Sequence, residues 1–213
     1  MQIRTQVFCF ALFLAILLTG SLVHSQVHGV QSVLSRIPAQ QAAPAPAPFY
    51  SAVAQRFHVT EPQIESVASK GLPPTQVVVV YFVAEHSLRA PEQILADRMA
   101  GKSWRDIALA SGLQPEQFYY PLPDAARPPF VNIYALYHRV PRDRWSWGSL
   151  ALSDADVENL VNLQFLAGLS GGGADDVVRL REHGFSYVSI GNLLLNGQKT
   201  AERAATSART VRS

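Results

Sequence analysis

The 213-residue chain has a single cysteine, Cys9, which lies inside an N-terminal apolar run. The rest of the chain therefore has no disulfide to stabilise it, and a cysteine-based metal site or a catalytic thiol is excluded there. An excess of one charge is lacking too, since 18 Lys and Arg stand against 16 Asp and Glu. This balance gives no sign of the basic face that a nucleic-acid-binding domain needs. Stability has to come from a packed apolar core.

Apart from the eight residues 77–84, long apolar runs are lacking after the first 25 residues. Within them, Arg4 precedes an apolar run from Val7 to Leu18, and short residues lead to Ser25. This layout is typical of a secretory signal peptide, and the run is short for a membrane span. We expect export to the periplasm or the extracellular space, with cleavage after Ser25. Membrane contact is expected only through an uncleaved signal peptide.

Three segments follow the signal peptide. Residues 26–48 end in alternating Ala and Pro, a composition that favours polyproline II and predicts a spacer. Residues 49–197 carry 12 Lys and Arg against 15 Asp and Glu and are numerous enough to bury a core, so we predict a single helical domain. Residues 198–213 are small, polar and basic, which predicts a disordered basic tail.

The domain contains an internal repeat. The 26 residues 82–107 return in degraded form as residues 165–190, with seven identities at a constant offset of 83. Most of the identical positions are apolar, small or turn-forming, so the repeat specifies a shape rather than a chemistry. Arg98 and Arg181 are the only charges kept identical, and we expect each to pack its stem on a neighbouring helix.

Helix signals run through both copies of the repeat. Starts are marked by Thr60, Ser103 and Ser153 as capping residues or by proline pairs, and stops by glycine. The run Val77–Val83 is rich in β-branched residues and by itself favours a strand. Its counterpart in the second copy contains helix formers, so we predict a buried helix at both places. The predicted fold is all-α.

In detail, we predict an array of short helix-turn-helix units with two imperfect repeats, about 50–112 and 150–197. An insert from Pro121 to Gly148, without a counterpart in the repeat, joins them. It is rich in Arg and aromatic residues, which dominate protein interfaces and also suit sugars and anionic polymers. Its candidate binding residues are Tyr137, Arg139, Arg142, Arg144, Trp145 and Trp147.

A structural interpretation of the insert competes with the binding one. Its aromatic residues would then hold the two units together, and its arginines would pair with Asp154, Asp156 and Glu158. These three acids suggest calcium at first sight, but the glycine and glutamate of a calcium loop are missing, and helix capping explains them. No zinc spacing occurs among the histidines. We predict no metal, no cofactor and no catalytic residue.

Residues 104–118 resemble the DNA-binding helix-turn-helix pattern, but the would-be recognition helix has no Lys or Arg. Residues 77–113, which begin VVVVYFV, and residues 132–168 and 175–190, which begin NIYALYHR and DDVVRLR, resemble a family of exported bacterial helical-repeat proteins of unknown function. The resemblance covers most of the domain and implies the same helical architecture. It carries no catalytic residue over to this chain.

Our leading hypothesis is an exported, non-enzymatic binding or scaffold module whose insert contacts a protein or a cell-envelope polymer. The alternative is an envelope enzyme whose groove between the two units gathers His138, Arg139 and Glu158. A pocket that clusters these side chains would favour the enzyme. A third interpretation, a DNA-binding protein, conflicts with the export signal, and we expect no nucleic-acid partner.

Overall fold

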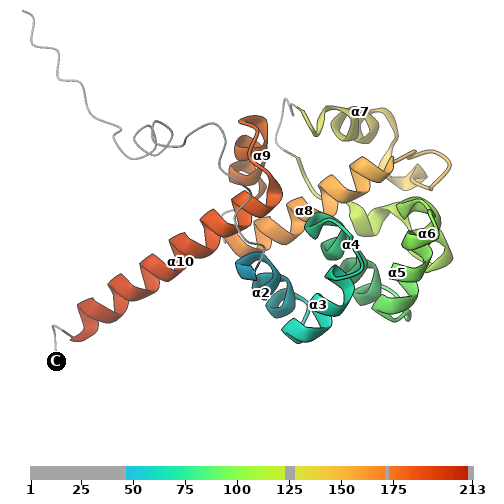
Figure 1. Ribbon diagram of the computed structural model, residues 1–213. Helices are drawn as coiled ribbons and strands as arrows, with labels where there is room; N and C mark the ends of the chain where they lie inside the picture. The colour runs from blue at the N-terminus through green and yellow to red at the C-terminus, as the bar shows by residue number, and fades with distance from the viewer. Residues whose placement is uncertain (1–46, 123–127, 171–172, 211–213) are drawn as a thin grey trace, which may run out of the picture. The chain divides into compact units, whose positions relative to one another are not determined.

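A computed structural model describes residues 47–122, 128–170 and 173–210, all within one compact unit that spans residues 42–213. In these three ranges the chain forms nine α-helices and two short 3₁₀-helices, and it forms no strand (Figure 1). The all-α prediction is confirmed. The expected signal peptide and the Ala/Pro-rich spacer up to residue 46 lie outside the described residues.

The helices are short and follow one another closely. The first five are α2 (Ala47–Arg56), α3 (Glu61–Ala68), α4 (Pro74–Glu85), α5 (Pro91–Met99) and α6 (Trp104–Ala110). The middle of the chain forms η1 (Pro115–Phe118), α7 (Val131–Arg139) and η2 (Arg142–Arg144), in which η denotes a 3₁₀-helix. The last three are α8 (Asp154–Ser170), α9 (Ala174–Glu182) and α10 (Tyr187–Thr210). Over the described part of the chain, none of them combines the length and the apolar character that crossing a membrane requires.

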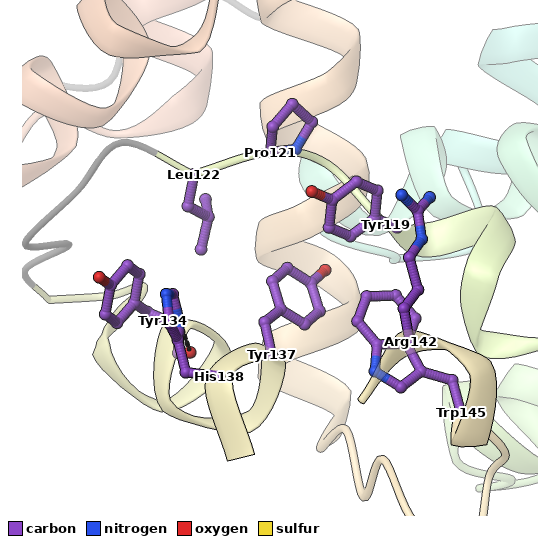
Figure 2. A pocket seen from close by; sticks show the side chains of 8 residues that line it. All are labelled: Tyr119, Pro121, Leu122, Tyr134, Tyr137, His138, Arg142 and Trp145. Atoms are coloured by element: carbon purple, nitrogen blue, oxygen red, sulfur yellow. Dashed lines mark hydrogen bonds between the residues drawn. The ribbon is translucent and has the colours of Figure 1, made fainter. Parts of the chain in front are cut away.

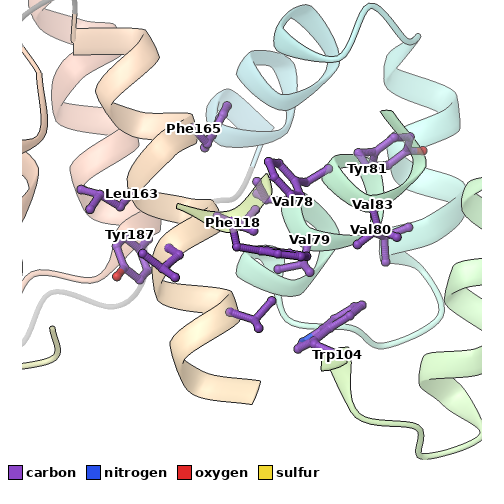
Figure 3. Packing of buried hydrophobic residues seen from close by; sticks show 14 of the residues in the cluster. Val78, Val79, Val80, Tyr81, Val83, Trp104, Phe118, Leu163, Phe165 and Tyr187 are labelled. Atoms are coloured by element: carbon purple, nitrogen blue, oxygen red, sulfur yellow. The ribbon is translucent and has the colours of Figure 1, made fainter. Parts of the chain in front are cut away.

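The valine-rich helix α4 lies at the centre of the core. Each residue from Val77 to Val83 is at most 3% exposed, because α3, α5, α8 and α10 all pack against α4. Figure 3 shows its valines beside the rings of Trp104 and Phe118. The strand propensity of the β-branched residues is outweighed here by the apolar area that a helix buries on all sides. The helix predicted at this run is confirmed.

Helix boundaries agree between the two repeat windows. At the offset of 83, α5 and α9 cover the same nine positions, and α6 and α10 begin at equivalent residues, Trp104 and Tyr187. The turn before each of these residues contains a glycine with positive φ, Gly101 at 84° and Gly184 at 85°, a conformation that strains any other residue. Local backbone structure thus follows the shared sequence pattern. Duplication of an ancestral unit stays a hypothesis.

Helix α10 corrects the predicted disordered tail. Residues 198–210 continue the helix as far as Thr210. The prediction rested on their low apolar content. Apolar content determines whether a segment can pack into a core, but it does not determine whether the segment forms a helix. The segment is rich in Ala with Lys, Glu and Arg, which have high helix propensity, and it extends a helix that α8 and α9 already hold in place. At the other end, α2 begins two residues before the predicted domain boundary at Phe49.

Candidate functional site

The insert is fixed against the start of α8. Ser153 and Asp156 cap this helix reciprocally, with Ser153 N donating to Asp156 Oδ2 at 2.9 Å and Asp156 N donating to Ser153 Oγ at 3.2 Å. The buried Asp156 also accepts a hydrogen bond from Asn132 Nδ2 at 2.9 Å, which ties α7 to the cap. Ile133 and Leu136 of α7 are buried in the core. One side of α7 is therefore held in place, and its other residues are free to line a surface.

Both tryptophans of the insert are buried, at 9% exposure for Trp145 and 5% for Trp147. Trp147 Nε1 donates to the Leu113 carbonyl at 2.8 Å, and its ring centroid lies 5.6 Å from that of Phe118. Trp145 Nε1 donates to the Val140 carbonyl at 2.9 Å. Because each indole N–H is bonded within the chain, Trp147 acts as a packing residue that joins the insert to the first unit.

Three aromatic rings meet at the surface end of the insert. Tyr119, which follows η1, lies with its centroid 5.1 Å from Tyr137 and 5.3 Å from Trp145, and the latter two stack at 5.0 Å. The guanidinium of Arg142 lies over the Tyr119 ring at 4.1 Å, and near Trp145 at 5.6 Å. Burial raises the pKa of Tyr137, whose hydroxyl is buried and has no hydrogen-bond partner among the described residues. We call Tyr119, Tyr137, Trp145 and Arg142 the aromatic cluster.

An open pocket of about 340 Å³ lies beside the aromatic cluster (Figure 2). It is lined by Tyr119, Pro121, Leu122, Tyr134, Tyr137, His138, Arg142 and Trp145. In Figure 2, Pro121 and Leu122 form the wall opposite α7, and Leu122 points toward Tyr134 and Tyr137. The His138 ring lies against the Tyr134 ring with centroids 4.0 Å apart and planes tilted by 33°, and its Nδ1 lies 2.9 Å from the Tyr134 carbonyl. Since a carbonyl oxygen only accepts, Nδ1 carries a proton.

A second hollow, of about 360 Å³, lies between α3 and α5 and is mainly apolar. Val67, Leu95 and Met99 line it, with Lys70 and Glu92 among its polar residues. It has no aromatic ring in its lining and no cluster of hydrogen-bond donors. The pocket in the insert is therefore the better candidate for a specific site.

The pocket contains three of the six binding residues predicted from the sequence. Tyr137, Arg142 and Trp145 line it, whereas the exposed Arg139 and Arg144 do not, and Trp147 is buried elsewhere. Sequence analysis missed two lining residues of note. Tyr134 shares a face of α7 with Tyr137 through i, i+3 spacing, which was a usable signal. Tyr119 precedes the insert in the chain, and no sequence signal placed it here.

The predicted pairing of insert arginines with the acids at the start of α8 is not found among the described residues. Asp154 forms an ion pair with Arg98 at 2.6 Å instead. Asp156 belongs to the α8 cap, and Glu158 accepts a hydrogen bond from the Thr75 hydroxyl on α4. These acids hold the helices together, so they do not neutralise Arg142.

The residues named for an enzyme do not gather in one place. His138 lines the pocket, but Arg139 does not, and Glu158 is engaged between α4 and α8. The described residues contain no group of three or more His, Cys, Asp or Glu able to hold a metal ion.

The stretch that resembles a DNA-binding helix-turn-helix does not form two α-helices. After α6 comes η1, a 3₁₀-helix of four residues in which Pro115 and Phe118 are buried. A recognition helix would have to expose one face along several turns in order to enter a major groove. Residues 104–118 therefore present no such helix.

The chain matches no protein-family model, no curated protein and no solved structure. The geometry and chemistry of the pocket therefore have to carry the functional argument.

Proposed function

We propose that the protein is an exported, non-enzymatic binding module that uses the pocket beside the aromatic cluster to hold a segment of another protein or of an envelope polymer. The observation that carries this proposal is the cluster itself: three aromatic rings in mutual contact, with the exposed Arg142 stacked on Tyr119 at the rim of an open pocket. Aromatic and Arg side chains supply most of the binding energy at protein interfaces.

Rigidity of the pocket wall supports a binding role. The Trp145 N–H is bonded to the Val140 carbonyl, and α7 is tied to the α8 cap through Asn132. The rings therefore keep their positions before a ligand arrives, and a ligand does not have to order them. Preorganised aromatic side chains have few rotatable bonds, which lowers the entropic cost of binding.

Export is the second part of the proposal and rests on the pattern of residues 1–25. It places the partner in the cell envelope or outside the cell. N-terminal sequencing of the protein purified from the envelope fraction is expected to start at Gln26. A mature protein that starts at Met1 would contradict cleavage.

The binding role is tested by affinity capture from envelope extract with matched arginine variants. Arg142→Ala removes the guanidinium over Tyr119 and is expected to lower partner recovery about tenfold, the equivalent of one lost charged contact. Arg144→Ala removes another exposed arginine, two residues away, that does not line the pocket, and recovery is expected to stay unchanged. Urea unfolding of both variants is expected to stay within about 1 kcal/mol of the parent, since cation–π contacts at exposed sites contribute little.

Two results would reject the pocket as the contact surface. One is full partner recovery with both Arg142→Ala and Tyr134→Ala. The other is an equal loss with Arg142→Ala and Arg144→Ala, which would indicate general charge attraction rather than a site.

A further inference from the structure

We infer that the pocket beside the aromatic cluster takes the carboxylate of an acidic peptide segment, and that Arg142 is the residue that binds this carboxylate. The inference rests on the proposed binding function and names the chemical class of the partner. It follows from the unpaired N–H groups of Arg142, from the way its side chain is held, and from the charges around the pocket.

The guanidinium of Arg142 is held in place without being neutralised. Its Cζ lies 4.1 Å from the centroid of the Tyr119 ring and 5.6 Å from that of Trp145, at the edge of the pocket (Figure 2). Among the described residues no carboxylate pairs with Arg142, and no oxygen accepts a hydrogen bond from its N–H groups. A cation–π contact leaves the positive charge in place. Arg142 is therefore a positioned cation with unused hydrogen-bond donors.

The other described arginines between residues 47 and 197 lack this combination. Four of them form ion pairs with carboxylates of the chain: Arg56, Arg89, Arg98 and Arg179. Arg181 donates to the Phe185 carbonyl. The remaining three are exposed, and none of them lies over an aromatic ring of the described residues: Arg105, Arg139 and Arg144. An arginine that is both fixed by rings and left without an acceptor is thus a feature of the pocket rather than of the surface in general.

The charges around the pocket favour an anion. Residues 128–148 contain three Arg against one Asp, within a domain in which acids outnumber bases by 15 to 12. That acid, Asp143, forms no ion pair among the described residues and does not line the pocket. Asp156 is buried in the α8 cap, and no Asp or Glu belongs to the described lining. Complementary charge steers association and selects the partner, so an acidic segment is favoured here.

A carboxylate suits the pocket better than a phosphate. Two N–H groups on one edge of a guanidinium match the two oxygens of a carboxylate, and one positive charge balances one negative charge. A phosphate carries about 1.5 to 2 negative charges at neutral pH and three acceptor oxygens, so it calls for more donors. The described lining contains neither a second arginine nor a lysine.

A peptide also supplies a donor for the histidine of the lining. Nδ1 of His138 is bonded to the Tyr134 carbonyl, so in the neutral ring Nε2 is an acceptor, which suits a backbone N–H. An acidic polysaccharide carries carboxylates too, but its sugar rings need an open aromatic face. Trp145 is only 9% exposed, with Tyr137 stacked on it and Tyr119 tilted by 53° against it. We therefore assign the site to an acidic peptide, with the polysaccharide as a competing outcome of the test.

The test is an NMR titration of the purified protein, in which the indole N–H signal of Trp145 reports binding at the pocket. The first probe is acetyl-Leu-Glu-Leu amide, whose glutamate is its single charged group. The matched probe is acetyl-Leu-Gln-Leu amide, which has nearly the same shape and no charge. The glutamate peptide is expected to bind saturably and about tenfold more tightly than the glutamine peptide, because a hydrogen bond to a charged group is lost in the second. Inorganic phosphate and trigalacturonate are the two further probes, and neither is expected to bind.

Three variants locate the contact. Arg142→Ala is expected to weaken binding of the glutamate peptide about tenfold and to leave that of the glutamine peptide unchanged. Arg142→Lys keeps the charge but lacks the planar pair of donors, so it is expected to recover only part of the lost affinity. Arg144→Ala removes an exposed charge outside the lining and is expected to bind the glutamate peptide as the parent does.

The possible failures separate this inference from the proposed function. Equal binding of the two peptides, or an equal loss with Arg142→Ala and Arg144→Ala, would overturn the carboxylate site at Arg142. Full binding by Arg142→Lys would overturn the paired-donor geometry. Binding of phosphate or trigalacturonate in place of the glutamate peptide, lost in Arg142→Ala, would overturn the assignment to peptide and keep an anion pocket. The assignment is also overturned if no probe binds while envelope capture still depends on Arg142. Only capture that is independent of both Tyr134 and Arg142 overturns the proposed function as well.

Discussion

The two repeat windows share a local arrangement around an arginine and an aromatic residue. Arg98 lies over the Trp104 ring at 4.6 Å, and Arg181 lies over the Tyr187 ring at 4.3 Å. Each arginine also donates from Nη1 to the backbone carbonyl four residues later. The same backbone turn thus carries the same pair of side chains in both windows. This explains why these two arginines are identical at the offset of 83: each ties the end of one helix to the start of the next.

The polar partners of the two arginines differ. Arg98 Nε donates to Gln76 Oε1 at 3.2 Å. The residue 83 positions later, which precedes the second window, is Asn159, but its Oδ1 accepts from the Tyr187 hydroxyl at 2.8 Å. Arg181 Nε is buried and has no hydrogen-bond partner among the described residues. The side-chain amide oxygen therefore accepts from the arginine where the aromatic residue is Trp104, and from the aromatic residue itself where that residue is Tyr187.

A carboxylate marks the second difference. Asp154, the first residue of α8, accepts from Arg98 Nη1 at 2.6 Å and from Trp104 N at 2.7 Å. In the described residues no carboxylate pairs with Arg181. The first window is thereby anchored to the start of α8, and Arg181 of the second window has no such carboxylate, so changes in the first window are expected to cost more stability. The predictions below test this difference.

The largest effect is expected for Trp104→Ala. The indole is fully buried and lies next to α4 (Figure 3). The Arg98 guanidinium lies over its ring. Its removal leaves a cavity and is expected to lower the free energy of unfolding by about 3–5 kcal/mol in urea melts. Tyr187→Ala in the second window is expected to cost less, since a phenol buries less area than an indole. A loss below about 1 kcal/mol for Trp104→Ala would contradict a core role for the indole.

An intermediate effect is expected for Arg98→Met, which keeps the apolar stem and removes the charge. Asp154 and Gln76 then lose a partner, and a hydrogen bond to a charged group contributes about 1.5–3 kcal/mol. Because the side chains of Arg98 and Asp154 are 17% and 37% exposed, solvent weakens the pair, and we expect a loss of about 2 kcal/mol. Arg181→Met is expected to cost about 1 kcal/mol or less, since it also removes an unpaired buried Nε–H.

The salt dependence gives a further test of the pair of Arg98 and Asp154. High ionic strength screens this partly exposed pair, so the stability losses of Arg98→Met and Arg181→Met are expected to become more similar at about 1 M salt. Equal losses for Arg98→Met and Arg181→Met at low salt would show that the anchor through Asp154 contributes nothing to stability.

Local signals in the sequence were sufficient for the helices. Ser103 and Ser153 were expected to cap helices, and each accepts a hydrogen bond from the backbone N–H three residues later, which confirms both. Glycine was expected to mark the ends of helices, and Gly101, which follows α5, has the positive φ that such an end uses. These features depend on a few neighbouring residues, so they can be identified from a short stretch of chain.

The pocket depends on contacts between distant residues and was predicted only in part. The abundance of Arg and aromatic residues in the insert indicated the region, and three of the predicted residues line the pocket. Composition cannot tell which ring is buried: Trp147 reaches Leu113, 34 residues away in the chain, whereas Tyr134 stays at the surface. Tyr119 joins the site because η1 packs beside α8, a tertiary contact without a local sequence signal.

The smallest effect is expected at the position directly after the two windows, where the side chains differ by one methyl group. The fully buried Ala108 follows the first window, and Gly191 follows the second. A Cβ on Gly191 would lie 2.8 Å from Cδ2 of Phe49 and 3.3 Å from Cδ2 of Leu166. Phe49 is itself fully buried, so its ring has little room to move. The added methyl group is expected to cost about 1–3 kcal/mol through overpacking, and the higher helix propensity of Ala regains about 1 kcal/mol. We therefore expect Gly191→Ala to lower the free energy of unfolding by about 1 kcal/mol.

Gly197→Ala is the matched control, because it places the same methyl group later in α10 with no atom within 4 Å. Here only the helix propensity acts, and the variant is expected to gain about 0.5–1 kcal/mol in the same urea melts. The opposite signs separate a packing effect from a backbone effect. An equal gain in stability for both variants would contradict this packing. It would show that the Phe49 ring of α2 does not lie close to Gly191 of α10.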